Sequence, residues 1–127
     1  MPIGKEIGSF SLNSTSLRIG VDAGGNNTVT ITLEGEVSGG WSGTVLSTMD
    51  ITMADLNESG SYVSNVAVYL NDGGIVTGSG TGIIAAIGNH KWRLNGVDVI
   101  SDGSRIAMEA EIELATRKMT GKIFEIT

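Results

Sequence analysis

A chain of 127 residues fits one domain, which can bury about two-thirds of the surface of its unfolded chain without cross-links. It contains no cysteine, which excludes disulfides, thiolate metal sites and a cysteine nucleophile. Fourteen acidic and eight basic side chains give a net charge of −6. A nucleic-acid surface gathers basic residues without carboxylates among them, whereas here basic residues lie among Glu109, Glu111 and Glu113. We therefore expect no nucleic-acid partner.

Residues 1–6 (MPIGKE) lack the long apolar run of a signal peptide. No stretch approaches the ~20 apolar residues of a membrane-spanning helix. The sequence therefore predicts a cytoplasmic protein without a membrane partner.

Nineteen glycines, one proline and abundant threonine, valine and isoleucine are typical of strands and turns. Helix-length apolar periodicity is missing. In the first half of the chain, two-residue alternation predicts strands over residues 7–19, 28–37, 41–53 and 62–70. Turn residues separate them, and the first strand alternates only if it contains one irregularity.

The second half continues the pattern. Strands are predicted over residues 75–82, 83–94, 97–100, 105–114 and 119–126, which makes eight or nine in all. Short connections favour antiparallel neighbours along the chain. We expect residues 1–127 to form a single all-β domain, a closed antiparallel barrel of about eight strands, with a two-sheet sandwich as the alternative.

Two turn signals leave the topology of residues 91–114 open. Asp102-Gly103 predicts a two-residue hairpin turn that places Ile100 opposite Arg105. Asn95-Gly96 is either a second hairpin turn or a bulge inside one long strand, and the bulge would place Trp92 opposite Ile112.

Both interpretations assign the same faces. The predicted interior side chains are His90, Trp92, Leu94, Val97, Val99, Ile106, Met108, Ala110, Ile112 and Leu114. The charged side chains between them form solvated rows: Lys91, Arg93, Glu109, Glu111 and Glu113.

The last hairpin extends this assignment. A turn at Thr116-Arg117 would place Gly121 opposite Ile112, where the missing side chain leaves room for the Trp92 ring. On the outer face, Ala107, Phe124 and Ile126 would form an apolar patch. Such a patch predicts a contact between copies of the chain, and so a homo-oligomer.

Residues 78–82 carry glycine at every second position, but they do not form a phosphate-binding loop. Such a loop needs the GxGxxG spacing or a lysine followed by serine or threonine, and a helix after it, and all of these are missing. The segment TGSGTGIIAAIG, residues 77–88, resembles the glycine-rich strand of allene oxide cyclase-like and dirigent-like barrels. This resemblance implies an eight-stranded barrel with an apolar lumen, trimers, and handling of small hydrophobic molecules without a cofactor. None of the catalytic residues of that family can be matched here.

His90 and Glu125 are the candidate acid–base groups. His90 is the only histidine and titrates near neutrality, although a structural, hydrogen-bonded role is the alternative. Glu125 falls on the predicted inner face near one end of the barrel, where burial would raise its pKa. A single histidine without further ligands predicts no metal site, and nothing indicates a cofactor.

Three functions remain open. The first is a binding module for a small hydrophobic molecule, lined by His90, Trp92, Met108 and Ile112, which needs a cavity of a few hundred Å³. The second is a cofactor-free isomerase or cyclase, which needs His90 and Glu125 at one cavity. The third is a structural or assembly module without a ligand pocket.

Overall fold

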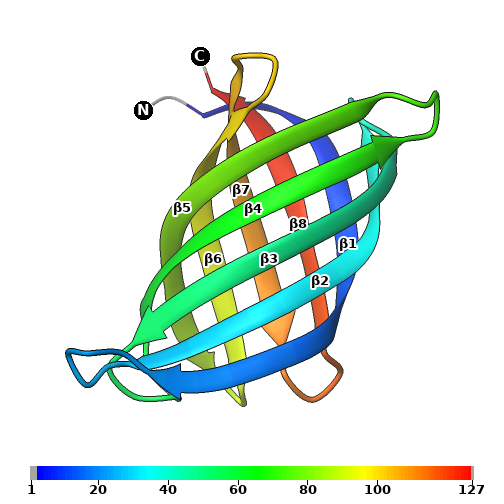
Figure 1. Cartoon of the computed structure of the whole chain (residues 1–127). Helices are drawn as coiled ribbons and strands as arrows, with labels where there is room; N and C mark the ends of the chain where they lie inside the picture. The colour runs from blue at the N-terminus through cyan, green and yellow to red at the C-terminus, as the bar shows by residue number, and fades with distance from the viewer. Residues whose placement is uncertain (1–2, 127) are drawn as a thin grey trace.

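The computed structural model describes residues 3–126, which form a closed barrel of antiparallel strands in a simple meander (Figure 1). The strands are β1 (Ile3–Val21), β2 (Asn27–Gly39), β3 (Gly43–Met53), β4 (Gly60–Leu70), β5 (Ile75–Gly88), β6 (Lys91–Ile100), β7 (Arg105–Glu113) and β8 (Lys118–Ile126). β8 pairs with β1 and closes the barrel. The predicted all-β barrel is confirmed, and the sandwich is excluded for these residues. Residues 1, 2 and 127 of the predicted domain lie outside the described range.

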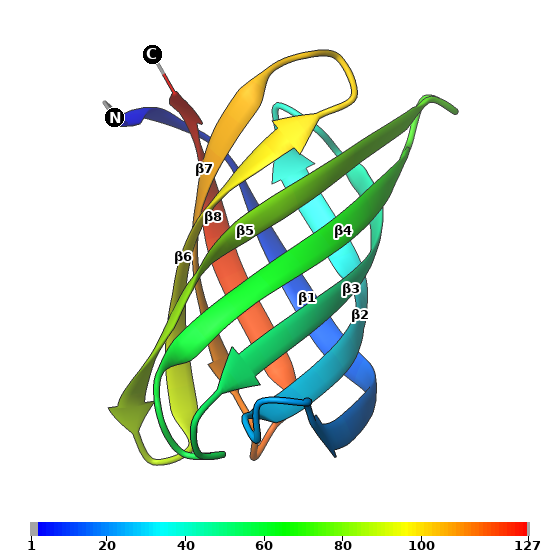
Figure 2. The ribbon, with the colours of Figure 1, turned by 60° about the vertical axis from the view of Figure 1, so that its left-hand side comes forward.

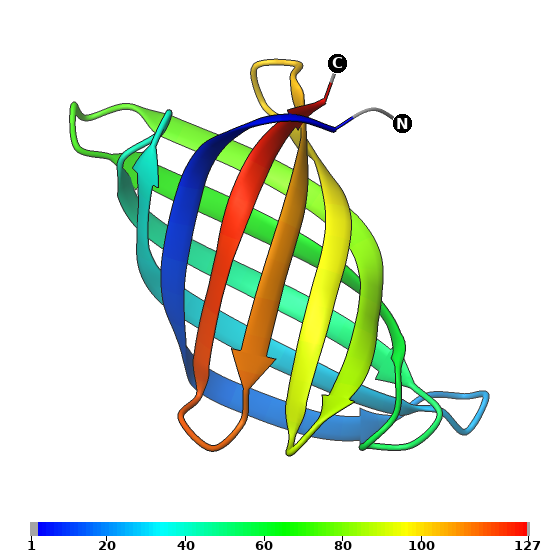
Figure 3. The same cartoon turned by 180° about the vertical axis from the view of Figure 1, so that it is seen from behind.

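The meander divides the connections between two ends of the barrel. We call the end where Ile3 pairs with Ile126 the terminal end; it also carries the connections 40–42, 71–74 and 101–104. The distal end carries the connections 22–26, 54–59, 89–90 and 114–117. Figures 1 and 3 show the β6–β7 turn and the β7–β8 turn at these opposite ends. Figure 2 shows how strongly the strands tilt around the barrel, as closure of a sheet requires.

Two-residue alternation sorts the first four strands as predicted. Val29, Ile31 and Leu33 are all buried, and the threonines between them on β2 are not. The irregularity expected in the first strand is a register shift between Ser14 and Ser16. One apolar face of each strand therefore supplies the core.

Three glycines in the middle of β5 face inward. Gly78, Gly80 and Gly82 lie level with inward residues of β4 and of β6, in an unbroken register. A side chain at Gly82 would meet the Tyr62 ring, with Cε2 2.7 Å from an added Cβ. A side chain at Gly80 would meet the Asp98 carboxyl group directly. The bare wall of β5 is therefore filled by side chains that lean across from its two neighbours.

The β6–β7 turn corrects the predicted interior. Its loop is one residue longer than predicted: the Ile100 amide donates to the Ser104 carbonyl at 2.9 Å, and Val99 pairs with Arg105. Gly103 takes the left-handed φ of 91° that this loop needs. The extra residue lies in the turn, so Asn95-Gly96 is neither a turn nor a bulge but continues β6.

This register places Trp92 opposite Ile112, as the bulge interpretation predicted. Beyond Gly96, however, the faces are the reverse of the prediction. Val99 is exposed and Val97 half-buried on the outer face, whereas Asp98 is buried in the lumen. The prediction that Val97 and Val99 are interior is wrong.

The β7–β8 connection is also longer than predicted, and Glu113 pairs with Lys118 across it. The observed pairing of β7 with β8 differs from the predicted pairing by two residues. Each side chain therefore lies on the predicted face, but its partner on the neighbouring strand is a different residue. Gly121 faces Ala110, and an added Cβ would lie 2.5 Å from the Phe10 ring. Gly121 therefore makes room for Phe10 rather than for Trp92.

Residues 83–94 do not form one strand. Asn89 and His90 form a tight turn between β5 and β6, and both take left-handed φ angles, 54° and 58°. Such angles match the primed turns that twist correctly with a hairpin. His90 is consequently exposed at the distal end, and the prediction that it points into the interior is wrong.

We predict that Gly82→Ala lowers the free energy of unfolding by about 1–3 kcal/mol, because the new methyl group forces the Tyr62 ring or the β6 backbone to move. Gly24→Ala is the control, since its Cβ would lie 3.5 Å from the Asp22 carboxylate, an ordinary contact. Its effect should stay within about 0.5 kcal/mol. Urea unfolding followed by circular dichroism measures both, and equal stabilities would contradict the packing described here.

Candidate functional site

The lumen is divided by its largest fully buried side chains, which are Met49, Tyr62, Ile84, Leu94 and Met119. Tyr62 and Leu94 border neither of the two hollows that remain, one toward each end of the barrel. The barrel is therefore not an open tube. Each hollow has its own lining and its own chemistry.

The hollow at the distal end, which we call the distal pocket, has a volume of about 510 Å³. Its lining is Leu17, Ile19, Val29, Ile31, Ile51, Met53, Leu56, Ile84, His90, Trp92, Ile112, Leu114, Ala115 and Arg117. Only His90 and Arg117 are ionisable, and both are exposed. The pocket is thus apolar, with one imidazole and one guanidinium among its exposed residues.

Trp92 connects this pocket to the β3–β4 connection, residues 54–59. The indole is 4% exposed, and its Nε1 donates to the Glu58 carbonyl at 3.1 Å. The side-chain amide of Asn27 donates to the backbone carbonyl of Ala54, at the start of the same connection, at 3.0 Å. These bonds hold the segment that carries Leu56 against the mouth of the pocket.

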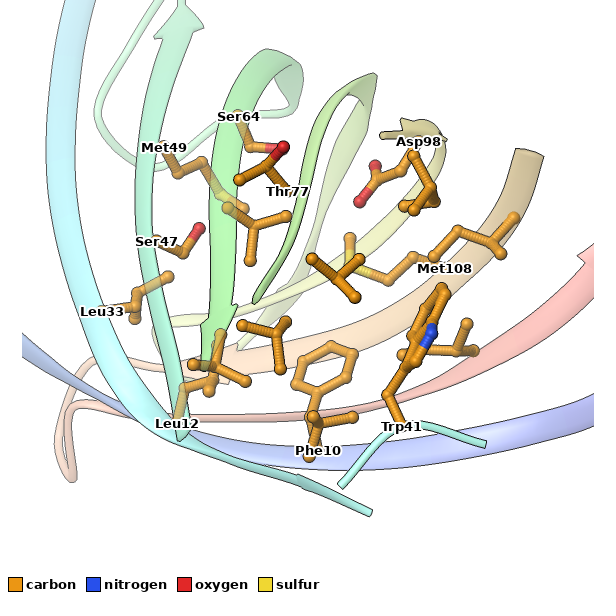
Figure 4. Close-up of a pocket in the computed structure, with 18 of the residues that line it drawn as sticks. Phe10, Leu12, Leu33, Trp41, Ser47, Met49, Ser64, Thr77, Asp98 and Met108 are labelled. Carbon is orange, nitrogen blue, oxygen red and sulfur yellow. The ribbon is translucent and has the colours of Figure 1, made fainter. Parts of the chain in front are cut away.

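The second hollow, which we call the inner cavity, has a volume of about 80 Å³ and lies toward the terminal end (Figure 4). Most of its lining is apolar: Phe10, Leu12, Leu33, Val37, Trp41, Val45, Met49, Val66, Val68, Val76, Ile100, Ile106, Met108, Met119 and Ile123. The polar lining residues are Ser47, Ser64, Thr77 and Asp98. Since a water molecule occupies about 30 Å³ in the liquid, this volume equals two or three waters.

Asp98 is the unusual group in the inner cavity. It is 8% exposed, and its Oδ1 is buried without a hydrogen-bond partner among the described residues. None of the residues that line the cavity is basic. Burial therefore raises the pKa of the Asp98 carboxyl group above its ordinary range.

Tyr62 is the second buried polar group without a partner in residues 3–126. It is 2% exposed, and an added Cβ at Gly96 would meet its hydroxyl. Burial, and secondarily the charge of Asp98, raises the pKa of the Tyr62 hydroxyl further above neutrality. Tyr62 is thus a permanent hydrogen-bond donor in the lumen.

The structure separates the residues that the sequence grouped as a binding site. His90, Trp92 and Ile112 line the distal pocket, whereas Met108 lines the inner cavity. Asp98 was missed, because the predicted register turned it outward. Residues 70–74 (Leu-Asn-Asp-Gly-Gly) and residues 100–104 (Ile-Ser-Asp-Gly-Ser) form the same kind of loop. The similarity of these two segments is the sequence signal that could have indicated the correct register of β6 and β7.

The proposed acid–base pair is not assembled. Glu125 lies opposite Ile106 near the terminal end of β8, beside Gly4, whereas His90 lies in a turn at the distal end. The isomerase hypothesis required both groups at one cavity, and they do not share one. That pairing is wrong.

The charged rows and the outer patch lie where the alternation placed them. Lys91 and Glu113 form an ion pair at 3.2 Å, and Lys122 reaches Glu6 at 3.4 Å. On the outer wall, Ala107 lies beside Phe124 in the register, and Ile126 borders the same hollow as Ala107. Association of copies through this patch stays a prediction.

Comparison of the chain with protein-family models, with curated proteins and with solved structures found no match. The resemblance of residues 77–88 to allene oxide cyclase-like barrels therefore stays a prediction. Within residues 3–126, no group of three or more His, Cys, Asp or Glu side chains is placed to hold a metal ion. The same residues contain no helix long and apolar enough to cross a membrane.

We predict that Asp98→Asn raises the melting temperature, and that the gain grows as the pH rises above about 4, the ordinary pKa of an aspartate in the unfolded chain. Because burial raises the pKa of Asp98, the folded chain keeps a proton there that the unfolded chain has already released. The native chain therefore loses stability as the pH rises through the interval between the two pKa values, and the asparagine variant does not. Thermal melts across the pH range measure this difference.

Asp55→Asn is the matched control, because Asp55 is exposed in the β3–β4 connection. Its melting temperature should follow that of the native chain at every pH. A constant gap between Asp98→Asn and the native chain would show that the Asp98 carboxyl group ionises at the same pH in the folded and unfolded states.

Proposed function

We propose that the protein is a binding module for a small hydrophobic molecule, and that the ligand occupies the distal pocket. The strongest support is the volume of this pocket, about 510 Å³, together with its almost entirely apolar lining. Ligand pockets in proteins usually measure about 300–1,000 Å³ and combine apolar walls with a few polar groups. The inner cavity, at about 80 Å³, falls below this range.

The entrance of the distal pocket carries apolar side chains that water would otherwise surround. Ile19 is 58% exposed and Leu56 41% exposed, and both line the pocket. Covering them with an apolar ligand removes this surface from water, at about 25 cal/mol per Å². Apolar binding is therefore favoured at the entrance as well as at the buried wall.

Trp92 and His90 have different parts in this proposal. The Trp92 indole nitrogen is already bonded to Glu58, so its ring offers the ligand an apolar face. His90 and Arg117 are the polar groups that can orient a ligand carrying one hydrogen-bonding atom. Trp92 and Ile112 thus supply contact area, and His90 supplies orientation.

The chemistry at the distal pocket supports binding rather than turnover. Its lining contains no carboxylate, and no second acid–base group accompanies His90 except the guanidinium of Arg117, which stays charged.

The cytoplasmic location stays a prediction from the sequence.

The test uses N-phenyl-1-naphthylamine, a neutral apolar fluorophore that accepts energy from tryptophan. In a Trp41→Phe background, Trp92 is the only tryptophan, and saturable quenching of its emission on titration reports binding of the fluorophore, which the substitutions below assign to the distal pocket. We expect Ile19→Asp to weaken this binding by at least about tenfold, because the ligand would have to desolvate a carboxylate.

Ile75→Asp is the control for this substitution. Ile75 is 60% exposed, about the same as Ile19, but it borders the connection 71–74 at the terminal end and lines no part of the distal pocket. Its affinity for the fluorophore should equal that of the background protein. Equal weakening by both variants, or no saturable quenching at all, would refute binding at this pocket.

A further inference from the structure

The inner cavity has a polar wall that the distal pocket lacks. Ser64, Gly80 and Asp98 lie level with one another on β4, β5 and β6, and all three face inward. Neighbouring strands lie about 4.8 Å apart, so Ser64 and Asp98 stand on either side of a position with no side chain. Figure 4 shows the Asp98 carboxyl group turned into the cavity across from Ser64.

This arrangement leaves hydrogen-bonding capacity unused. Asp98 Oδ1 is buried and has no partner within residues 3–126, and the whole residue is only 8% exposed. A buried polar group without a partner destabilises the folded state, and most such groups in folded proteins find a protein or water partner. The glycine at position 80 makes room for the Asp98 carboxyl group, which a Cβ there would meet, and so lets this group reach the cavity.

The chemistry of this wall restricts its ligand. An anionic head would be repelled by the Asp98 carboxylate. An ammonium head would have to leave water and pair with Asp98 in an otherwise apolar cavity, where the cost of desolvating two charges can exceed their attraction. A hydroxyl group fits, because it donates one hydrogen bond to Asp98, accepts one from Ser64 and carries no charge.

The volume and the lining at the terminal end restrict the rest of the ligand. About 80 Å³ holds a hydroxyl group and the first carbons attached to it. Trp41 lines the cavity and is half-buried, so its ring lies between the cavity and solvent. A longer chain would leave past Trp41 and Phe10, whose rings are apolar.

We propose that the inner cavity binds the hydroxyl end of an aliphatic alcohol, with Asp98 accepting its hydrogen bond, Ser64 donating one, and the carbon chain directed toward Trp41. This site lies on the other side of the buried Tyr62 and Leu94 from the distal pocket, and the two share no lining residue. If no alcohol binds in the inner cavity, the proposed function at the distal pocket is unaffected. If no ligand binds in the distal pocket, the proposal for the inner cavity is likewise unaffected.

The test compares 1-butanol with diethyl ether, its isomer, which has an acceptor oxygen but no O–H. Nuclear magnetic resonance of the ¹⁵N-labelled chain follows the Gly80 and Asp98 amides and the Trp41 indole, with the Trp92 indole as the reporter of the distal pocket. We expect 1-butanol to shift the first three signals saturably, with at least about tenfold higher affinity than the ether.

Substitutions then assign the preference to its residues. Asp98→Leu should bring the ratio of the two affinities close to one. Ser64→Ala should weaken 1-butanol by about threefold to tenfold, whereas Ser61→Ala, on the exposed side of the same strand, should not change it. If Asp98→Leu does not fold, the two serine variants still decide the question.

Three results would overturn the proposal. The first is equal affinity for the alcohol and the ether in the native chain. The second is tighter binding of n-butylammonium than of 1-butanol, which would assign the cavity to a cation. The third is the absence of any saturable shift, which would mean that the cavity holds ordered water only.

Discussion

The structure depends on how the inside of a narrow barrel is filled. Eight strands enclose a lumen that side chains can just fill, or that holds one small ligand. In this chain, β5 contributes glycines at three consecutive inward positions, Gly78, Gly80 and Gly82, so one side of the lumen has no side chains of its own. Tyr62 from β4 and Asp98 from β6 lean into this space. The packing of the barrel therefore requires large or polar side chains opposite bare backbone.

That constraint also explains why the lumen is divided. The Tyr62 ring lies against Gly82 and Gly96, in the middle of the barrel, where Leu94 and Met49 are also fully buried. On the distal side of this layer lies the apolar distal pocket. On the terminal side lies the smaller inner cavity, which contains the Asp98 carboxyl group. Two unpartnered polar groups, each costing about 1–3 kcal/mol, persist there because the surrounding apolar core holds them in place. One fold thus presents two binding environments of different polarity.

Much of the fold follows from residue patterns that can be read directly. Alternation over residues 28–37 separates Val29, Ile31 and Leu33 from the threonines between them, and the structure buries the first set. The barrel, its meander order and the position of Trp92 opposite Ile112 were all within reach of such patterns. The site was less accessible. Asp98 looks like a solvated residue between two valines, and His90 looks like part of an alternating strand.

The amino-acid sequence by itself determined that the chain makes eight or nine short-linked strands, because alternation and turn residues are local properties. Only the tertiary structure decided where the odd residue between β6 and β7 goes. With that residue in the turn at Gly103, Asp98 faces the lumen and Val99 faces water; with it inside the strand, the two would exchange places. The decision rests on the register of whole neighbouring strands, since a slip of one residue reverses every side chain beyond it.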